Sequence, residues 1–145
     1  MEQMYQHGLI APVLALIAWT FVMWAWLYAT RIPAMQKAGI DPQAAANAGR
    51  LELPPRVTRV ADNYNHLHEQ PVIFYALALA AQMEGASDAI NIGLAWTYVS
   101  LRIVHSLIQA TANIIVLRFF VFTINTLVLL ALLVRASGQI FGWWW

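Results

Sequence analysis

Long apolar segments, separated by short polar ones, set the pattern of this chain. Residues 9–30 carry no charge, and 22 residues at 1.5 Å each can span a hydrocarbon core of about 30 Å. The same reasoning predicts transmembrane helices over about 9–30, 57–83, 89–112 and 114–134. We therefore predict one all-α domain, residues 1–145, folded as a bundle of four transmembrane helices.

Composition supports a membrane location. Only 10% of the residues are charged, whereas a soluble domain carries roughly a quarter. The seven Trp residues also fit a membrane protein, because Trp collects where lipid meets water. The bilayer is thus the first predicted partner. Without a basic run the chain is not expected to bind nucleic acid, and without Cys it has no thiolate nucleophile and no Cys-based metal site.

Charges in the connections predict the orientation. Five basic residues lie within 31–59 against two acidic ones, whereas the turn over 84–88 is acidic. The positive-inside rule then makes the 31–58 loop cytoplasmic and leaves both termini outside, with Arg135 as the exception. A short helix over 42–50 could form within the loop, with a Pro at its first position.

Polar residues recur at steps of three and four along three predicted helices, so each helix presents a polar stripe. The stripes consist of Arg59, Asp62, Asn63, His66, Glu69 and Gln70; of Arg102, His105, Gln109 and Asn113; and of Arg118 and Asn125. Ionisable groups within a span normally face the bundle interior and indicate a function. They could simply be ion pairs that stabilise the bundle. Their concentration in one half of the membrane favours a polar ligand site, and the excess of Arg predicts an anionic ligand.

Two other chemistries fit the sequence less well. His66 and Glu69 could share a metal ion, but His68 lies on another face of the helix and the nearby Arg residues oppose a cation, so no metal is predicted. Ser106 follows His105 directly, and adjacent residues on a helix do not face each other. This spacing argues against a Ser–His hydrolase.

Two segments of the chain resemble the MAPEG family, the membrane-associated proteins of eicosanoid and glutathione metabolism. They are the block Arg59…Ala61-Asp62-Asn63…Glu69-Gln70-Pro71-Val72 and the string Tyr98-Val99-Ser100-Leu101-Arg102-Ile103-Val104-His105-Ser106-Leu107, which is similar to a bacterial branch of the family. The resemblance implies a homotrimer of four-helix subunits in a bacterial inner membrane. It also implies glutathione as co-substrate, held between subunits near the cytoplasmic face.

The resemblance assigns roles to individual residues. Arg118, within Leu117-Arg118, corresponds to the Arg that stabilises the glutathione thiolate. Glu69 is expected to hold the amino group of glutathione, and Arg59 a carboxylate. The remaining residues expected to position the tripeptide are Asn63, His66, Arg102 and His105.

The chain departs from the family pattern at positions that bear on catalysis. His66 stands where the family usually has Asn, and Ile103 and Leu107 lie where enzyme members carry Tyr. The leading expectation is a glutathione-dependent transferase or peroxidase acting on lipophilic substrates. The alternative is a non-catalytic membrane protein that binds a lipid or another ligand, because the family includes such proteins. A third hypothesis is a proton-coupled transporter that uses Glu69 or Asp62.

Overall fold

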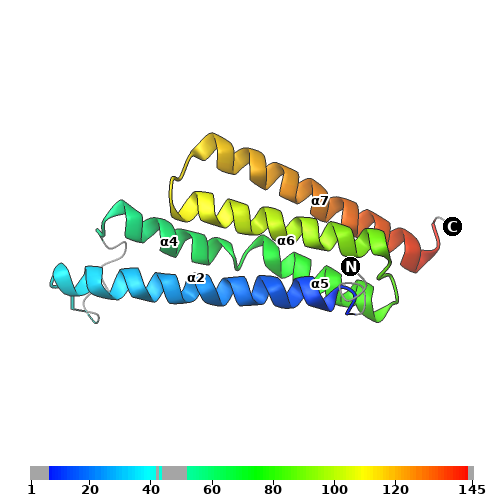
Figure 1. Cartoon of the computed structure of the whole chain (residues 1–145), viewed down its shortest axis with the longest axis horizontal. Helices are drawn as coiled ribbons and strands as arrows, with labels where there is room; N and C mark the ends of the chain where they lie inside the picture. The colour runs from blue at the N-terminus through cyan, green and yellow to red at the C-terminus, as the bar shows by residue number, and fades with distance from the viewer. Residues whose placement is uncertain (1–6, 42, 44–51, 144–145) are drawn as a thin grey trace.

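The chain folds into helical rods that lie side by side along the long axis of the molecule, with the last rod inclined to the others (Figure 1). The computed structural model describes residues 7–41, 43 and 52–143. Its helices are α2 (Ile10–Lys37), α4 (Pro55–His66), α5 (Gln70–Met83), α6 (Ala89–Ala110) and α7 (Ile115–Phe141). Since α4 and α5 follow one another in a single rod, the predicted all-α bundle of four helices is confirmed. Of these helices, α2 and α7 are long and apolar enough to cross a membrane.

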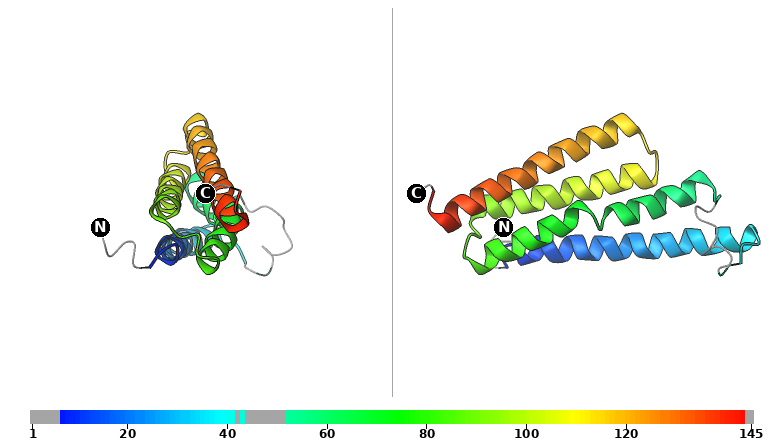
Figure 2. Two further views of the ribbon diagram at one scale, coloured as in Figure 1. Left: turned by 90° about the vertical axis from the view of Figure 1, so that its right-hand side faces the viewer. Right: turned by 180° about the vertical axis from the view of Figure 1, so that it is seen from behind.

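The rods are stacked so that α2 and α7 lie on opposite sides, with α4–α5 and α6 between them (Figure 2). Buried apolar side chains from all four rods form the main core, in which Phe74 of α5 stacks on Tyr98 of α6 with ring centroids 4.5 Å apart. Many large apolar residues on the outer faces are exposed, including Phe21 on α2 and Phe120 on α7. Such a surface is expected when lipid, and not water, surrounds the bundle.

Helix α2 is longer than predicted, since residues 31–37 of the expected loop are helical. Pro33 removes one backbone hydrogen bond from the helix. Because it lies in the last turns, most of α2 is unaffected and the helix continues to Lys37. The Thr30 hydroxyl also donates to the carbonyl of Trp26 at 2.9 Å. Apart from residue 43, the predicted short helix over 42–50 lies outside the described residues.

The second predicted helix, 57–83, is interrupted at residues 67–69. Glu69 has φ −94° and ψ −100°, outside the helical region, and Pro71 has no N–H to continue the hydrogen-bond ladder. The Arg102 guanidinium of α6 donates to the carbonyl of His66 at 2.5 Å. The same carbonyl also accepts from the backbone N–H of Glu69 at 3.4 Å, so the bond from Arg102 strengthens the hydrogen bonding at the break and ties it to α6.

Helix α7 extends past the predicted end at residue 134, because the charge that follows is neutralised. Arg135 donates to the carboxylate of Asp88 at 2.5 Å, and Gln139 donates to the same carboxylate at 2.8 Å. Asp88 also caps α6 by accepting from the backbone N–H of Asn91 at 2.8 Å. These contacts join the start of α6 to the last turns of α7.

The Asp88 contacts predict a loss of stability in acid. Burial alone would raise the pKa of Asp88, but the bonds from Asn91, Arg135 and Gln139 outweigh it and hold the pKa below its ordinary value of 3.8. A carboxylate with a lowered pKa in the folded state stabilises the protein above the pKa of the unfolded state. We therefore expect the melting temperature, followed by circular dichroism in micelles, to fall as the pH drops below about 4.

Two variants isolate this contribution. Asp88→Asn should melt at a lower temperature at neutral pH and show a flatter acid profile, because the amide can still cap α6 but cannot pair as an anion with Arg135. Glu84→Gln changes a carboxylate of the same turn outside this network and should keep the wild-type profile. An Asp88→Asn profile that matches the wild type at every pH would contradict the assignment.

Candidate functional site

The break in the second rod faces a cavity formed by α4, α6 and α7. The cavity has a volume of about 360 Å³. Its lining consists of His66, His105, Ile115, Arg118, Phe119 and Phe122. Two imidazoles and a guanidinium thus share a space with apolar and aromatic side chains, at the end of the bundle where α6 turns into α7 (Figure 1).

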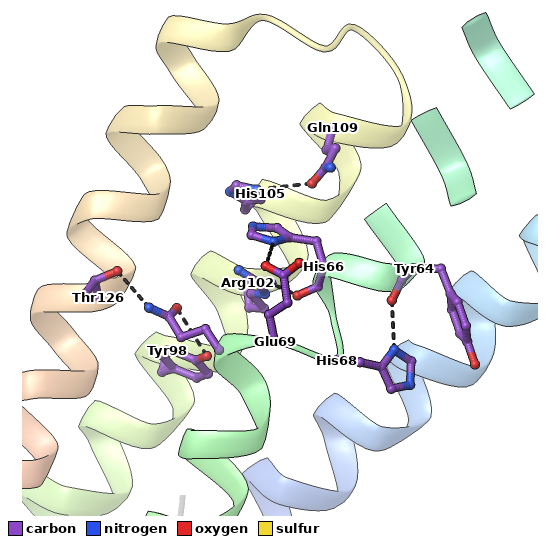
Figure 3. Close-up of polar contacts among 10 residues, drawn as sticks. Tyr64, His66, His68, Glu69, Tyr98, Arg102, His105, Gln109 and Thr126 are labelled. Atoms are coloured by element: carbon purple, nitrogen blue, oxygen red, sulfur yellow. Dashed lines mark hydrogen bonds and ion pairs between the residues drawn. The ribbon is translucent and has the colours of Figure 1, made fainter. Parts of the chain in front are cut away.

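His66 is the last residue of α4, and its ring contacts side chains from three different segments of the chain. Its Nδ1 is 2.6 Å from the carboxylate of Glu69, which the break turns back toward it (Figure 3). The His66 ring centroid lies 5.3 Å from that of His105 and 5.5 Å from that of Phe122. The side chain of Glu69 is 65% exposed, so part of its carboxylate remains accessible.

Arg102 is a buried cation directly beneath this cluster, with only 1% of its surface exposed. One guanidinium nitrogen donates to the carbonyl of His66, while Nε and Nη1 are buried and have no partner among the described residues. A buried charge is costly unless it is paired or hydrogen-bonded. The site therefore offers cationic N–H donors that are not satisfied within the described part of the chain.

Arg118 presents a second guanidinium from the first turn of α7. Its Nη1 donates to the Asn113 side-chain carbonyl at 2.6 Å, and its buried Nε has no partner in the described residues. Asn113 has φ +52°, a left-handed conformation that Asn tolerates better than most residues. The turn between α6 and α7 thereby holds Arg118 at the edge of the cavity.

His105 lies beside His66 on α6 and is also buried. Its Nε2 is 3.3 Å from the side-chain carbonyl of Gln109, and its Nδ1 has no partner among the described residues. The structure thus brings together five of the seven predicted site residues: His66, Glu69, Arg102, His105 and Arg118.

The other two predicted residues are engaged elsewhere within the subunit. Asn63 is buried and donates to the Ser106 hydroxyl at 2.5 Å, a bond that joins α4 to α6. Arg59 donates to the carbonyl of Thr111 at 2.9 Å, just past the end of α6. Neither residue lines the cavity.

The structure adds residues that the sequence did not single out as site residues. The Phe122 ring contacts both imidazoles, and its position four residues after Arg118 places it on the same face of α7. Gln70 connects two helices: its amide donates to Thr126 at 2.8 Å and its carbonyl accepts from Tyr98 at 3.4 Å (Figure 3). Within residues 7–41, 43 and 52–143 no group of three or more His, Cys, Asp and Glu side chains could hold a metal ion.

Comparison with known proteins identifies the family. The model of the MAPEG family matches residues 9–138, which is most of the chain. The comparisons with curated proteins and with solved structures found no match.

The bond between Asn63 and Ser106 should couple α4 to α6 energetically. A double-mutant cycle with Asn63→Leu and Ser106→Ala, followed by unfolding in micelles, should give a coupling free energy of about 0.6 kcal/mol and at most about 1.7 kcal/mol, the mean and the maximum for hydrogen bonds between membrane helices. Asn63→Leu combined with Thr123→Val should be additive, because the Thr123 hydroxyl bonds to its own helix. Additivity in both cycles would show that the Asn63 bond contributes nothing to packing.

Proposed function

The chain belongs to the MAPEG family, and from this premise we propose that it is a glutathione-dependent transferase or peroxidase that acts on lipophilic substrates from the bilayer. One observation carries the proposal. The guanidinium of Arg118 lies in the wall of a cavity that two imidazoles and apolar side chains also line, and the buried guanidinium of Arg102 bonds to the carbonyl of the cavity residue His66. Each of the two guanidinium groups has a buried N–H that lacks a partner in the described residues. Such a site suits an anionic, polar co-substrate next to an apolar one.

The charges of the site fit glutathione. The tripeptide carries two carboxylates and one ammonium at neutral pH, and carboxylates are the usual partners of guanidinium groups. Arg102 offers Nε and Nη1, while the exposed Glu69 offers an acceptor for the ammonium. His66 and His105 provide further nitrogen atoms along the same wall.

When bound, glutathione would supply a thiol, which acts as a nucleophile or as a two-electron reductant. The task of the chain is to favour the thiolate form of that thiol. A cationic donor in a site of low polarity lowers a thiol pKa, and Arg118 presents such a donor at the cavity edge. Phe119 and Phe122 would border the apolar co-substrate.

The proposal extends to the oligomeric state of the protein and to its membrane. We infer a homotrimer of the bacterial branch in an inner membrane, with a neighbouring subunit closing the glutathione site. The cavity lies beside Phe119, which is 72% exposed in the subunit, so one wall is available to a neighbour. The basic residues Lys37 and Arg56 lie at the end of the bundle where α2 stops and α4 starts, which supports a cytoplasmic location for that end.

The role of Arg118 can be tested by substitution. Arg118→Ala should leave the assembly intact, abolish the ultraviolet thiolate absorbance of bound glutathione, and lower turnover by about 100-fold or more, as loss of a preorganised donor does. Arg56→Ala removes an exposed guanidinium from the same end of the bundle and should change neither signal.

Binding heat measured in parallel separates the possible outcomes. Heat without thiolate absorbance in Arg118→Ala supports the assigned role, whereas unchanged thiolate absorbance contradicts it. A folded wild-type assembly that shows neither heat nor thiolate absorbance would overturn the glutathione proposal. That result would favour the alternative of a non-catalytic protein that binds a lipid or another apolar ligand.

A further inference from the structure

A second cavity lies on the other side of the break, between α2 and the junction of α4 with α5. Its volume is about 240 Å³. Its lining includes Thr20, Phe21, Trp24, Tyr64, His68 and Tyr75. None of these residues belongs to the proposed glutathione site.

The break separates two imidazoles that lie only two residues apart in the sequence. His66 turns toward Glu69 and the first cavity, whereas His68 lies on the α2 side, beneath Tyr64 (Figure 3). His68 is thus an ionisable side chain in the wall of an otherwise uncharged cavity, a placement that within a membrane indicates a function.

The hydrogen bond of His68 determines what its ring can offer. Nδ1 is 2.9 Å from the backbone carbonyl of Tyr64. A carbonyl can only accept, so Nδ1 must carry the hydrogen, and Nε2 of the neutral ring is then a hydrogen-bond acceptor. The Tyr64 and His68 rings pack edge to face with their centroids 4.7 Å apart, which helps to hold the imidazole in this orientation. The acceptor is therefore preorganised.

The rest of the lining restricts the chemistry of a ligand. The described lining contains no Asp, Glu, Lys or Arg, so the cavity has no counter-ion for a charged molecule. Phe21 and Trp24 offer aromatic surface, and the Thr20 hydroxyl already donates to the carbonyl of Leu16 at 3.0 Å. The volume lies just below the usual range for drug-sized ligands, about 300 to 1,000 Å³, and therefore suits a single substituted ring.

We propose that this cavity binds an uncharged lipophilic phenol or ring alcohol, whose O–H donates to Nε2 of His68. The ring lies against Phe21 and Trp24, and an alkyl substituent extends into the surrounding lipid. This site is separate from the glutathione cavity and does not depend on the proposed catalytic activity.

Photolabelling of the full chain in nanodiscs tests the proposal. The probe is 4-octylphenol with a diazirine on the alkyl carbon next to the ring, which remains at the cavity, and labelled residues are mapped by mass spectrometry. Labelling should fall on residues 17–24 of α2 and 67–75 at the break. Unlabelled 4-octylphenol should compete, whereas its methyl ether should compete about five- to tenfold less well, the effect expected for one lost hydrogen bond. Equal competition by the ether would overturn the proposal.

Variants identify the acceptor. His68→Phe keeps a ring of similar size and should reduce labelling about five- to tenfold, whereas His68→Gln, which retains an acceptor, should restore part of it. His7→Phe is the matched control and should label as the wild type does. Thr20→Leu fills the cavity from α2 without altering the imidazole, and it should also reduce labelling. This variant tests the site independently if His68→Phe does not fold. Unchanged labelling in both His68→Phe and Thr20→Leu would contradict the assigned site.

Discussion

The bond between the Arg102 guanidinium and the carbonyl of His66 is the contact on which the rest of the structure depends. Ending a helix inside a bilayer exposes backbone groups that lipid cannot satisfy. A buried cation faces the complementary problem, because it requires an acceptor. The carbonyl of His66 accepts from the backbone N–H of Glu69 and also gives the Arg102 guanidinium an acceptor, so that the break in the second rod is tied to α6 in the bundle interior.

The break at residues 67–69 determines the directions in which the polar side chains of the second rod point. A continuous helix would carry the stripe from Arg59 to Gln70 along one face. The interruption at 67–69 instead turns Glu69 back onto His66 and leaves His68 on the α2 side. The break thus has a cavity on either side of it, one lined by His66 and the other by His68. The first is lined by the guanidinium of Arg118 and suits an anion, while the second is lined by the imidazole of His68 with no Asp, Glu, Lys or Arg and suits a hydroxyl group.

The two ends of the bundle use charge differently. Toward the α6–α7 turn, buried guanidinium N–H groups of Arg102 and Arg118 have no partner in the described residues. At the opposite end the carboxylate of Asp88 accepts from Asn91, Arg135 and Gln139, and these bonds stabilise the packing of α6 against α7. Arginine side chains thus carry N–H groups that are unsatisfied among the described residues at one end and form a packing contact at the other.

Much of this could be predicted from the sequence, because helix periodicity is local. The apolar segments predicted the four rods, and steps of three and four predicted that His66, Arg102, His105 and Arg118 would face inward. The sequence also carried the family resemblance that the comparison confirms. What it could not determine depends on contacts between distant segments. The bond from the Asn63 amide to the Ser106 hydroxyl joins residues 43 positions apart. Arg135 was expected to follow the last helix, but it lies within that helix and pairs with Asp88. The break itself relies on a donor 36 residues away, so only the tertiary structure could decide which imidazole faces which cavity.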